Sequence, residues 1–201
     1  QLNNKLSINI GAQYISSLDL FGNVDNSSDI VPRLGFSYHL NDSWAIKLRH
    51  GEAYRHPTVG ERTIETPEIQ KGTPDLTSES IATTELQLFH QTQERLFTAT
   101  LYNSKESNLI LLVPSDDPKF ALENRNQGEI LSQGMELEYK QQITPQWYME
   151  LSAVYQRNRD HKGLKNVNLS PNFSFKSGVG YESNNWYAGL YLLHYSKYHD
   201  N

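Results

Sequence analysis

Apolar and polar side chains alternate with a period of two along most of the chain. The clearest case is residues 44–54, where Trp44, Ile46 and Leu48 alternate with Lys47 and Arg49. Because successive side chains of a strand point to opposite faces, this pattern predicts strands with one apolar and one polar face. We expect nine such strands, over residues 5–15, 30–40, 44–54, 80–91, 95–104, 129–142, 147–157, 172–182 and 186–196.

The connections between the predicted strands alternate between short and long. The short ones are polar turns at 41–43, 92–94, 143–146 and 183–185. The long ones contain most of the prolines and lie at 16–29, 55–79, 105–128 and 158–171. Outer-membrane barrels have this arrangement, with short periplasmic turns and long extracellular loops. The expected fold class is therefore all-β: part of an antiparallel, up-and-down transmembrane β-barrel of about nine strands.

Aromatic residues gather next to the short turns. Each of the three tryptophans begins a predicted strand directly after such a turn, and a tyrosine lies shortly before it. Tyr and Trp favour the boundary between hydrocarbon and headgroups, because each has an apolar body and a polar tip. An aromatic row that covers the core of a water-soluble sheet is the alternative explanation. The predicted membrane girdle is Tyr38, Trp44, Tyr139, Trp147, Tyr181 and Trp186.

Charged residues recur on the opposite faces of the same strands. Arg or Lys in the middle of a lipid-facing wall costs about 2–4 kcal/mol, so we expect these side chains to face a polar lumen. Arg49 and Glu85 lie at similar distances from the short turns of adjacent strands, and we expect them to pair across the wall. The predicted lumen-facing residues are Arg33, Lys47, Arg49, Glu85, Glu136, Glu138 and Lys176.

Composition excludes several other classes of protein. The 201 residues have a net charge of −5, which argues against a nucleic-acid partner. There is no cysteine, so a disulfide framework and thiolate metal sites are excluded. The longest apolar run, 109–113, is far shorter than the roughly 20 residues of a membrane helix. The mean hydropathy of −0.65 agrees with a barrel, because lumen-facing residues are polar.

The sequence shows no motif typical of an enzyme or a metal site. The seven histidines have no H-E-x-x-H or similar ligand spacing, and there is no G-x-S-x-G motif or phosphate-binding glycine loop. Glu136 and Glu138 share a face, but a polar lumen lining accounts for them better than acid–base chemistry does. We therefore expect a protein with no catalytic activity, no cofactor and no resident metal.

Four short motifs occur in order along the chain. They are Gly51-Glu52-Ala53-Tyr54-Arg55-His56-Pro57, Thr73-Pro74-Asp75-Leu76-Thr77-Ser78-Glu79, Thr84-Glu85-Leu86, and Asn126-Gln127-Gly128 followed by Gly134-Met135-Glu136-Leu137-Glu138. In this order and strand context they resemble the C-terminal β-barrel of TonB-dependent outer-membrane receptors. The resemblance covers most of the chain but only part of such a receptor. We therefore expect residues 1–201 to be part of the barrel domain, with the plug domain absent.

The resemblance implies an outer-membrane receptor for TonB-energised uptake of a ferric siderophore or a similar scarce cargo, such as haem or cobalamin. The implied partners are outer-membrane lipid, a metal-chelate cargo and, through a plug outside this chain, the TonB complex. The receptor is expected to be a monomer in the bacterial outer membrane. An anionic chelate would be gripped near the long loops by charge-assisted hydrogen bonds. The candidate residues are Tyr54, Arg55, Arg62, Arg125, Tyr155, Arg157 and Arg159.

Two other functions are compatible with the strand pattern. A passive porin-like channel would have the same alternating wall without a plug. A secreted β-sandwich that binds a ligand would bury its apolar rows against a second sheet, and its aromatic residues would be spread along the strands.

Overall fold

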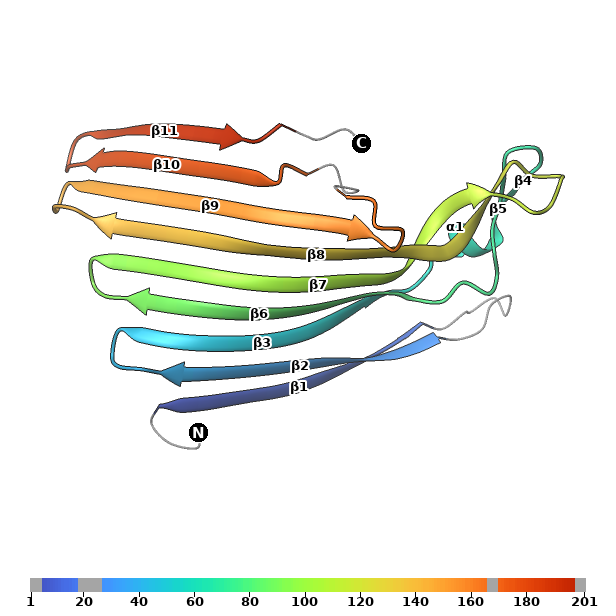
Figure 1. Cartoon of the computed structure of the whole chain (residues 1–201), viewed down its shortest axis with the longest axis horizontal. Helices are drawn as coiled ribbons and strands as arrows, with labels where there is room; N and C mark the ends of the chain where they lie inside the picture. Colours follow the sequence, from blue (N-terminus) through green and yellow to red (C-terminus); the bar gives the residue numbers. More distant parts are fainter. Residues whose placement is uncertain (1–4, 18–26, 166–169, 198–201) are drawn as a thin grey trace.

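Nine long strands form one continuous antiparallel sheet (Figure 1). The structure, a computed structural model, describes residues 5–17, 27–165 and 170–197. The strands pair in chain order, so the up-and-down topology predicted from the sequence is confirmed. The long strands are β1 (Leu6–Ser17), β2 (Ser27–His39), β3 (Trp44–Arg55), β6 (Glu79–Gln91), β7 (Arg95–Pro114), β8 (Leu122–Gln142), β9 (Trp147–Asp160), β10 (Phe173–Glu182) and β11 (Tyr187–Tyr195).

The short connections lie at one end of the sheet, which we call the short-turn end (Figure 1). At the opposite, long-loop end, α1 (Val59–Thr63), β4 (Glu65–Thr66) and β5 (Gln70–Lys71) lie beside the ends of β7 and β8. β5 joins the sheet through a parallel pairing with β8. Among the described residues, no helix is long and apolar enough to cross a membrane.

Strands β7 and β8 extend further than the sequence indicates, and the predicted loop at 105–128 is wrong in this respect. β7 continues to Pro114 and β8 begins at Leu122, so most of this segment is strand. The ladder is irregular after Glu106, and Asn108 adopts a left-handed backbone with a φ of 56°. Such an irregularity shifts the period-two pattern, which is why the alternation ends early in the sequence. The predicted loop at 55–79 likewise contains α1, β4 and β5.

The polar face of the sheet is the more buried of its two faces. Several of the least exposed strand residues share the face of the charged side chains: Val31, Ala45, Thr100, Ser104 and Asn158 are between 1% and 8% exposed. The opposite face exposes large apolar side chains on every long strand, among them Ile10, Leu34, Leu48, Leu86, Leu101, Met135, Trp147, Val179 and Leu190. A water-soluble sheet has the reverse distribution, so this sheet requires an apolar solvent on its outer side.

Two glycines of β10 make room for tyrosine rings on the polar face. A Cβ at Gly180 would lie 2.1 Å from the Tyr148 ring, and one at Gly178 would lie 2.6 Å from the Tyr191 ring. The rings therefore occupy the space that side chains at these positions would take. The two glycines therefore allow Tyr148 of β9 and Tyr191 of β11 to lie over the backbone of β10.

We expect Gly180→Ala to destabilise the folded protein by about 1–3 kcal/mol, because the Tyr148 ring must leave its position. Gly51→Ala is the matched control, since nothing lies within 4 Å of a Cβ at that position on the same face. Urea unfolding midpoints in lipid vesicles measure both variants. Equal midpoints would contradict the packing role of Gly180.

Candidate functional site

All seven predicted lumen-facing residues share the polar face of the sheet, as the strand registers show. Arg49 Nη2 lies 3.0 Å from Glu85 Oε2, directly across the ladder between β3 and β6. The pairing expected from the sequence is therefore present. Lys176 Nζ forms a similar pair with Glu150 Oε1 at 3.2 Å. The other predicted residues on this polar face, which we call the inner face, are Arg33, Lys47, Glu136 and Glu138.

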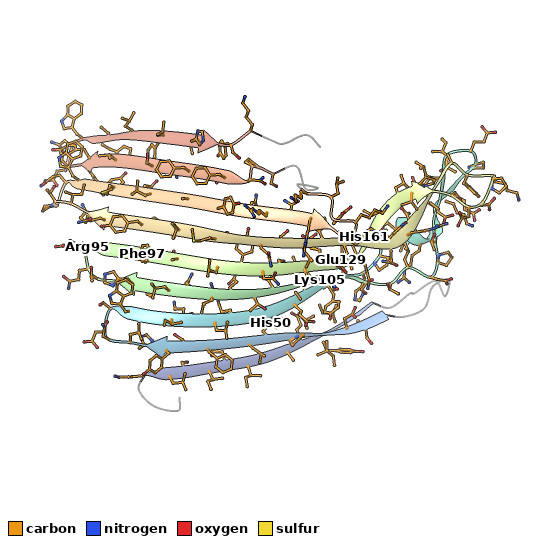
Figure 2. The ribbon with its side chains drawn as sticks, in the orientation of Figure 1. His50, Arg95, Phe97, Lys105, Glu129 and His161 are labelled. Atoms are coloured by element: carbon orange, nitrogen blue, oxygen red, sulfur yellow. The ribbon has the colours of Figure 1, made fainter. Side chains whose placement is uncertain are left out.

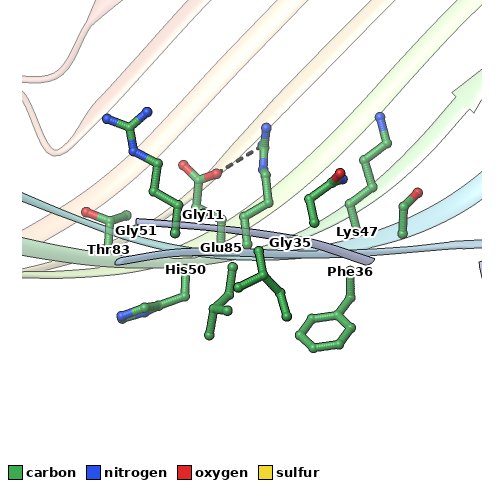
Figure 3. A pocket seen from close by; sticks show the side chains of 14 residues that line it. Gly11, Gly35, Phe36, Lys47, His50, Gly51, Thr83 and Glu85 are labelled. Atoms are coloured by element: carbon green, nitrogen blue, oxygen red, sulfur yellow. Dashed lines mark ion pairs between the residues drawn. The ribbon is translucent and has the colours of Figure 1, made fainter. Parts of the chain in front are cut away.

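A hollow of about 690 Å³ borders the wall at β1, β2, β3 and β6. Figure 3 shows Lys47, Thr83 and Glu85 on one side of the sheet, and Phe36 and His50 on the other. The polar side of the hollow thus has three cations, Arg33, Lys47 and Arg49, and one carboxylate, Glu85, which suits contact with a polar surface. In the described part of the chain, no group of three or more His, Cys, Asp or Glu residues could hold a metal ion.

The aromatic row at the short-turn end has more members than the sequence predicted. The Trp44 ring stacks on His90 with centroids 4.3 Å apart and meets Phe97 edge-on at 6.3 Å. Trp147 lies 5.1 Å from Tyr181. Figure 2 shows Phe97 near this end of the wall. His90 and Phe97 could not be predicted, because only the register of β3, β6 and β7 brings them beside Trp44.

The other predicted girdle residues are placed by the same registers. Tyr38 lies opposite Ile46, and Tyr139 lies opposite Phe97 on the apolar face. Trp186, just before β11, is 76% exposed. An exposed indole of this size suits a membrane–water boundary better than contact with water alone.

Arg55 connects the elements at the long-loop end. Its Nη1 and Nη2 atoms each lie 3.0 Å from one carboxylate oxygen of Glu61, and its Nε donates to Glu79 at 2.5 Å. Glu79 also accepts a hydrogen bond of 2.7 Å from the backbone N–H of Ile110. One guanidinium group therefore links the end of β3 to α1 and β6, and through Glu79 to β7.

Glu61 also caps α1. Its carboxylate accepts a hydrogen bond of 2.7 Å from the backbone N–H of Thr58, and the Thr58 hydroxyl accepts one of 3.2 Å from the backbone N–H of Glu61. The guanidinium of Arg55, and then the donors of Thr58, hold the pKa of Glu61 below its usual range. The Thr-x-x-Glu spacing is a capping box, so this helix start could have been found in the sequence.

Two asparagines of β8 hold the rest of this loop. Asn126 binds the backbone N–H and C=O of Thr77 at 2.8 and 3.0 Å, and Asn124 Nδ2 donates to the carbonyl of Glu61 at 2.9 Å. Sequence reasoning missed these contacts because their partners are distant along the chain. We call Arg55, Glu61, Glu79, Asn124 and Asn126 the rim lattice.

The seven predicted cargo-binding residues fall into two groups. Arg55, Arg62 and Arg125 lie in or beside the rim lattice, and their guanidinium groups already have partners. Arg62 is 8% exposed and donates to the Leu76 carbonyl at 3.0 Å. Arg125 pairs with Glu123 and Asp116. By strand alternation, the other four share the face of Trp44 and Trp147, the apolar one. They are Tyr54, Tyr155, Arg157 and Arg159.

Comparison with solved structures shows the same fold in outer-membrane proteins. The ferric yersiniabactin uptake receptor FyuA from Yersinia pestis has a TM-score of 0.74 and 18% identity, covering 96% of this chain and 31% of that one. The FrpB iron transporter from Neisseria meningitidis (F3-3 variant) has a TM-score of 0.70 and 15% identity, covering 91% and 29%. The copper transporter OprC has a TM-score of 0.69 and 18% identity, covering 94% and 32%. The chain thus spans about a third of each.

No curated protein sequence matches the chain. A family model, described as TonB dependent receptor-like, beta-barrel, matches residues 1–201. Because this match covers the whole chain, the chain belongs to the TonB-dependent receptor-like β-barrel family.

Proposed function

We propose that this chain forms part of the wall and outer rim of a bacterial outer-membrane receptor, which takes up a ferric siderophore or a comparable metal chelate with energy from the TonB complex. The observation that carries the proposal is the distribution of exposure, because the polar face holds Val31, Ala45, Thr100, Ser104 and Asn158 at 1–8% exposure, whereas the other face exposes large apolar side chains on every long strand. Family membership supports a receptor of this kind. The names of FyuA and FrpB support an iron cargo, and that of OprC widens the choice to other metals.

The wall and the rim have different roles in this proposal. The inner face, with its Arg49–Glu85 pair, would line the lumen and contact the plug that transmits the force from TonB. The rim lattice would hold the extracellular loops in place for cargo binding. Uptake of this kind proceeds by binding and release, so it requires no covalent chemistry from the chain.

The cationic side chains differ in whether a carboxylate already neutralises them, and this determines which of them can bind an anionic cargo. The guanidinium groups of Arg55 and Arg125 already face carboxylates, so they position the rim and have little charge left for a chelate. Arg33 and Lys47 border the hollow on the inner face. In the described residues, no carboxylate forms an ion pair with either side chain. We therefore expect Arg33 and Lys47 to contact an anionic cargo or plug.

Arg55→Gln is expected to loosen the rim without unfolding the wall. Losing the links to Glu61 and Glu79 should favour local opening by about 1.4 kcal/mol, so proteolytic cleavage within residues 56–78 should be roughly tenfold faster. Limited proteolysis of the full-length protein followed by mass spectrometry measures the rate.

The cleavage rate of the wild type should approach that of Arg55→Gln as the pH falls below the usual carboxyl range. Glu61, whose pKa is lowered in the folded state, then loses its charge.

Arg49→Gln is the matched control, because Arg49 is also on β3 and also pairs with a carboxylate of β6. That pair lies in the wall, away from the loop, so cleavage within 56–78 should not change. Equal acceleration by both substitutions would contradict the special role of Arg55 at the rim.

The transport proposal is tested with the full-length protein in a bacterial outer membrane. Uptake of radiolabelled ferric siderophores, haem, cobalamin and copper is measured with and without a protonophore that collapses the inner-membrane proton gradient. We expect uptake of one of these cargoes to stop when the gradient is lost, because TonB then delivers no energy. Uptake that continues unchanged would contradict an energised receptor and support a passive channel.

A further inference from the structure

The outer face of β9 changes from apolar to cationic near the long-loop end. Along this face Trp147, Met149, Leu151, Ala153 and Tyr155 follow one another at alternate positions, and the next two positions are Arg157 and Arg159. Both arginines are exposed. They point away from the inner face, so neither a plug nor a cargo inside the lumen would reach them.

The height of these arginines on the wall matches the edge of a membrane. Arg157 follows Trp147 by ten residues, which corresponds to roughly 33 Å along a strand. A strand tilt of about 40° reduces this to about 25 Å along the membrane normal, the usual height of the apolar band of a barrel. Since Trp147 lies in the aromatic row at the short-turn end, Arg157 falls at the opposite headgroup layer.

Local contacts hold Arg157 at this level. Its guanidinium lies 5.3 Å from the ring centroid of Tyr155, and its Nε donates to the Tyr155 hydroxyl. β10 pairs with β9 only as far as Tyr155, and further along β9 an isolated antiparallel bridge joins Arg159 to Lys165. A groove of about 510 Å³ opens there, and its lining includes Leu131, Gln133, Arg157, Arg159 and Lys165.

The nearby carboxylates have other partners, so they do not neutralise the charges of Arg157 and Arg159. Glu129 lies 2.9 Å from Lys105 Nζ, and both residues are close to the long-loop end in Figure 2. Asp160 Oδ1 accepts hydrogen bonds of 2.9 and 2.8 Å from the backbone N–H groups of Lys162 and Leu164. None of the ion pairs found in the described parts of the chain includes Arg157 or Arg159.

We propose that Arg157 and Arg159, with Lys165 at the edge of the groove, bind the phosphate of a lipid headgroup in the outer leaflet of the outer membrane. A guanidinium offers paired donors that match phosphate oxygens, and cations near an anionic membrane surface bind its headgroups. The acyl chains of the same lipid would lie along the apolar outer face below Arg157. The site depends on the membrane placement in the proposed function, and it is independent of the cargo.

The test compares lipid binding by the wild-type full-length protein and by an Arg157→Gln/Arg159→Gln double variant. Native mass spectrometry in detergent measures binding of purified lipid A, which has phosphate groups, and of dephosphorylated lipid A. We expect the double variant to bind lipid A about 30-fold more weakly, as the loss of two headgroup contacts implies. The wild type should bind dephosphorylated lipid A about as weakly as the variant does.

Two further variants keep the test specific. Arg95→Gln removes an exposed arginine on the same face at the short-turn end of β7, and it should leave lipid A binding unchanged (Figure 2). An Arg157→Lys/Arg159→Lys variant keeps both charges, so it should retain most of the binding even if the glutamine variant folds poorly.

Equal lipid A binding by the wild type and the folded double variant would overturn the proposal. Equal binding of the two lipid forms by the wild type would also overturn it, and displacement of lipid A by an equal concentration of inorganic phosphate would assign the site to free phosphate instead. The assay contains no metal chelate, so its failure is distinct from a failure of the transport proposal.

Discussion

The sheet depends on one constraint: inside hydrocarbon, every backbone N–H and C=O group must find its hydrogen-bond partner within the protein. Between neighbouring strands, the continuous antiparallel ladder from β1 to β11 meets this constraint. Side chains then have only two directions available, towards lipid or towards the lumen. The exposed leucines on one face and the Arg49–Glu85 pair on the other both follow from this division.

Outside the apolar band, water is available again and different interactions hold the structure. The rim is built from charged and amide side chains, and Arg55, Glu61 and Asn126 connect segments that are far apart in sequence. Arg157 and Arg159 mark the boundary between these two regimes on the outer face of β9. The same chain therefore has an apolar wall, a cationic boundary and a polar rim, one above the other.

The wall could be predicted from the sequence because alternation is a local signal. It gave nine strands, their two faces and even the pairing of Arg49 with Glu85. The rim could not be predicted in the same way. Asn126 contacts Thr77 only because the pairing of β6, β7 and β8 brings the two residues together. The irregular ladder near Asn108 also interrupts the alternation. Arg157 was expected to face a cargo, although continuing the alternation from Trp147 places it outside.

Cysteine labelling can show whether lipid covers one face of this wall and a polar lumen the other. The chain has no cysteine, so single cysteines at Ile46, Lys47, Leu48 and Arg49 can be introduced into the full-length protein one at a time. A membrane-impermeant maleimide is then added to outer membranes. We expect labelling at 47 and 49 with protection at 46 and 48. Equal protection at all four positions, or a protein that partitions with the soluble fraction, would contradict a wall between lipid and lumen.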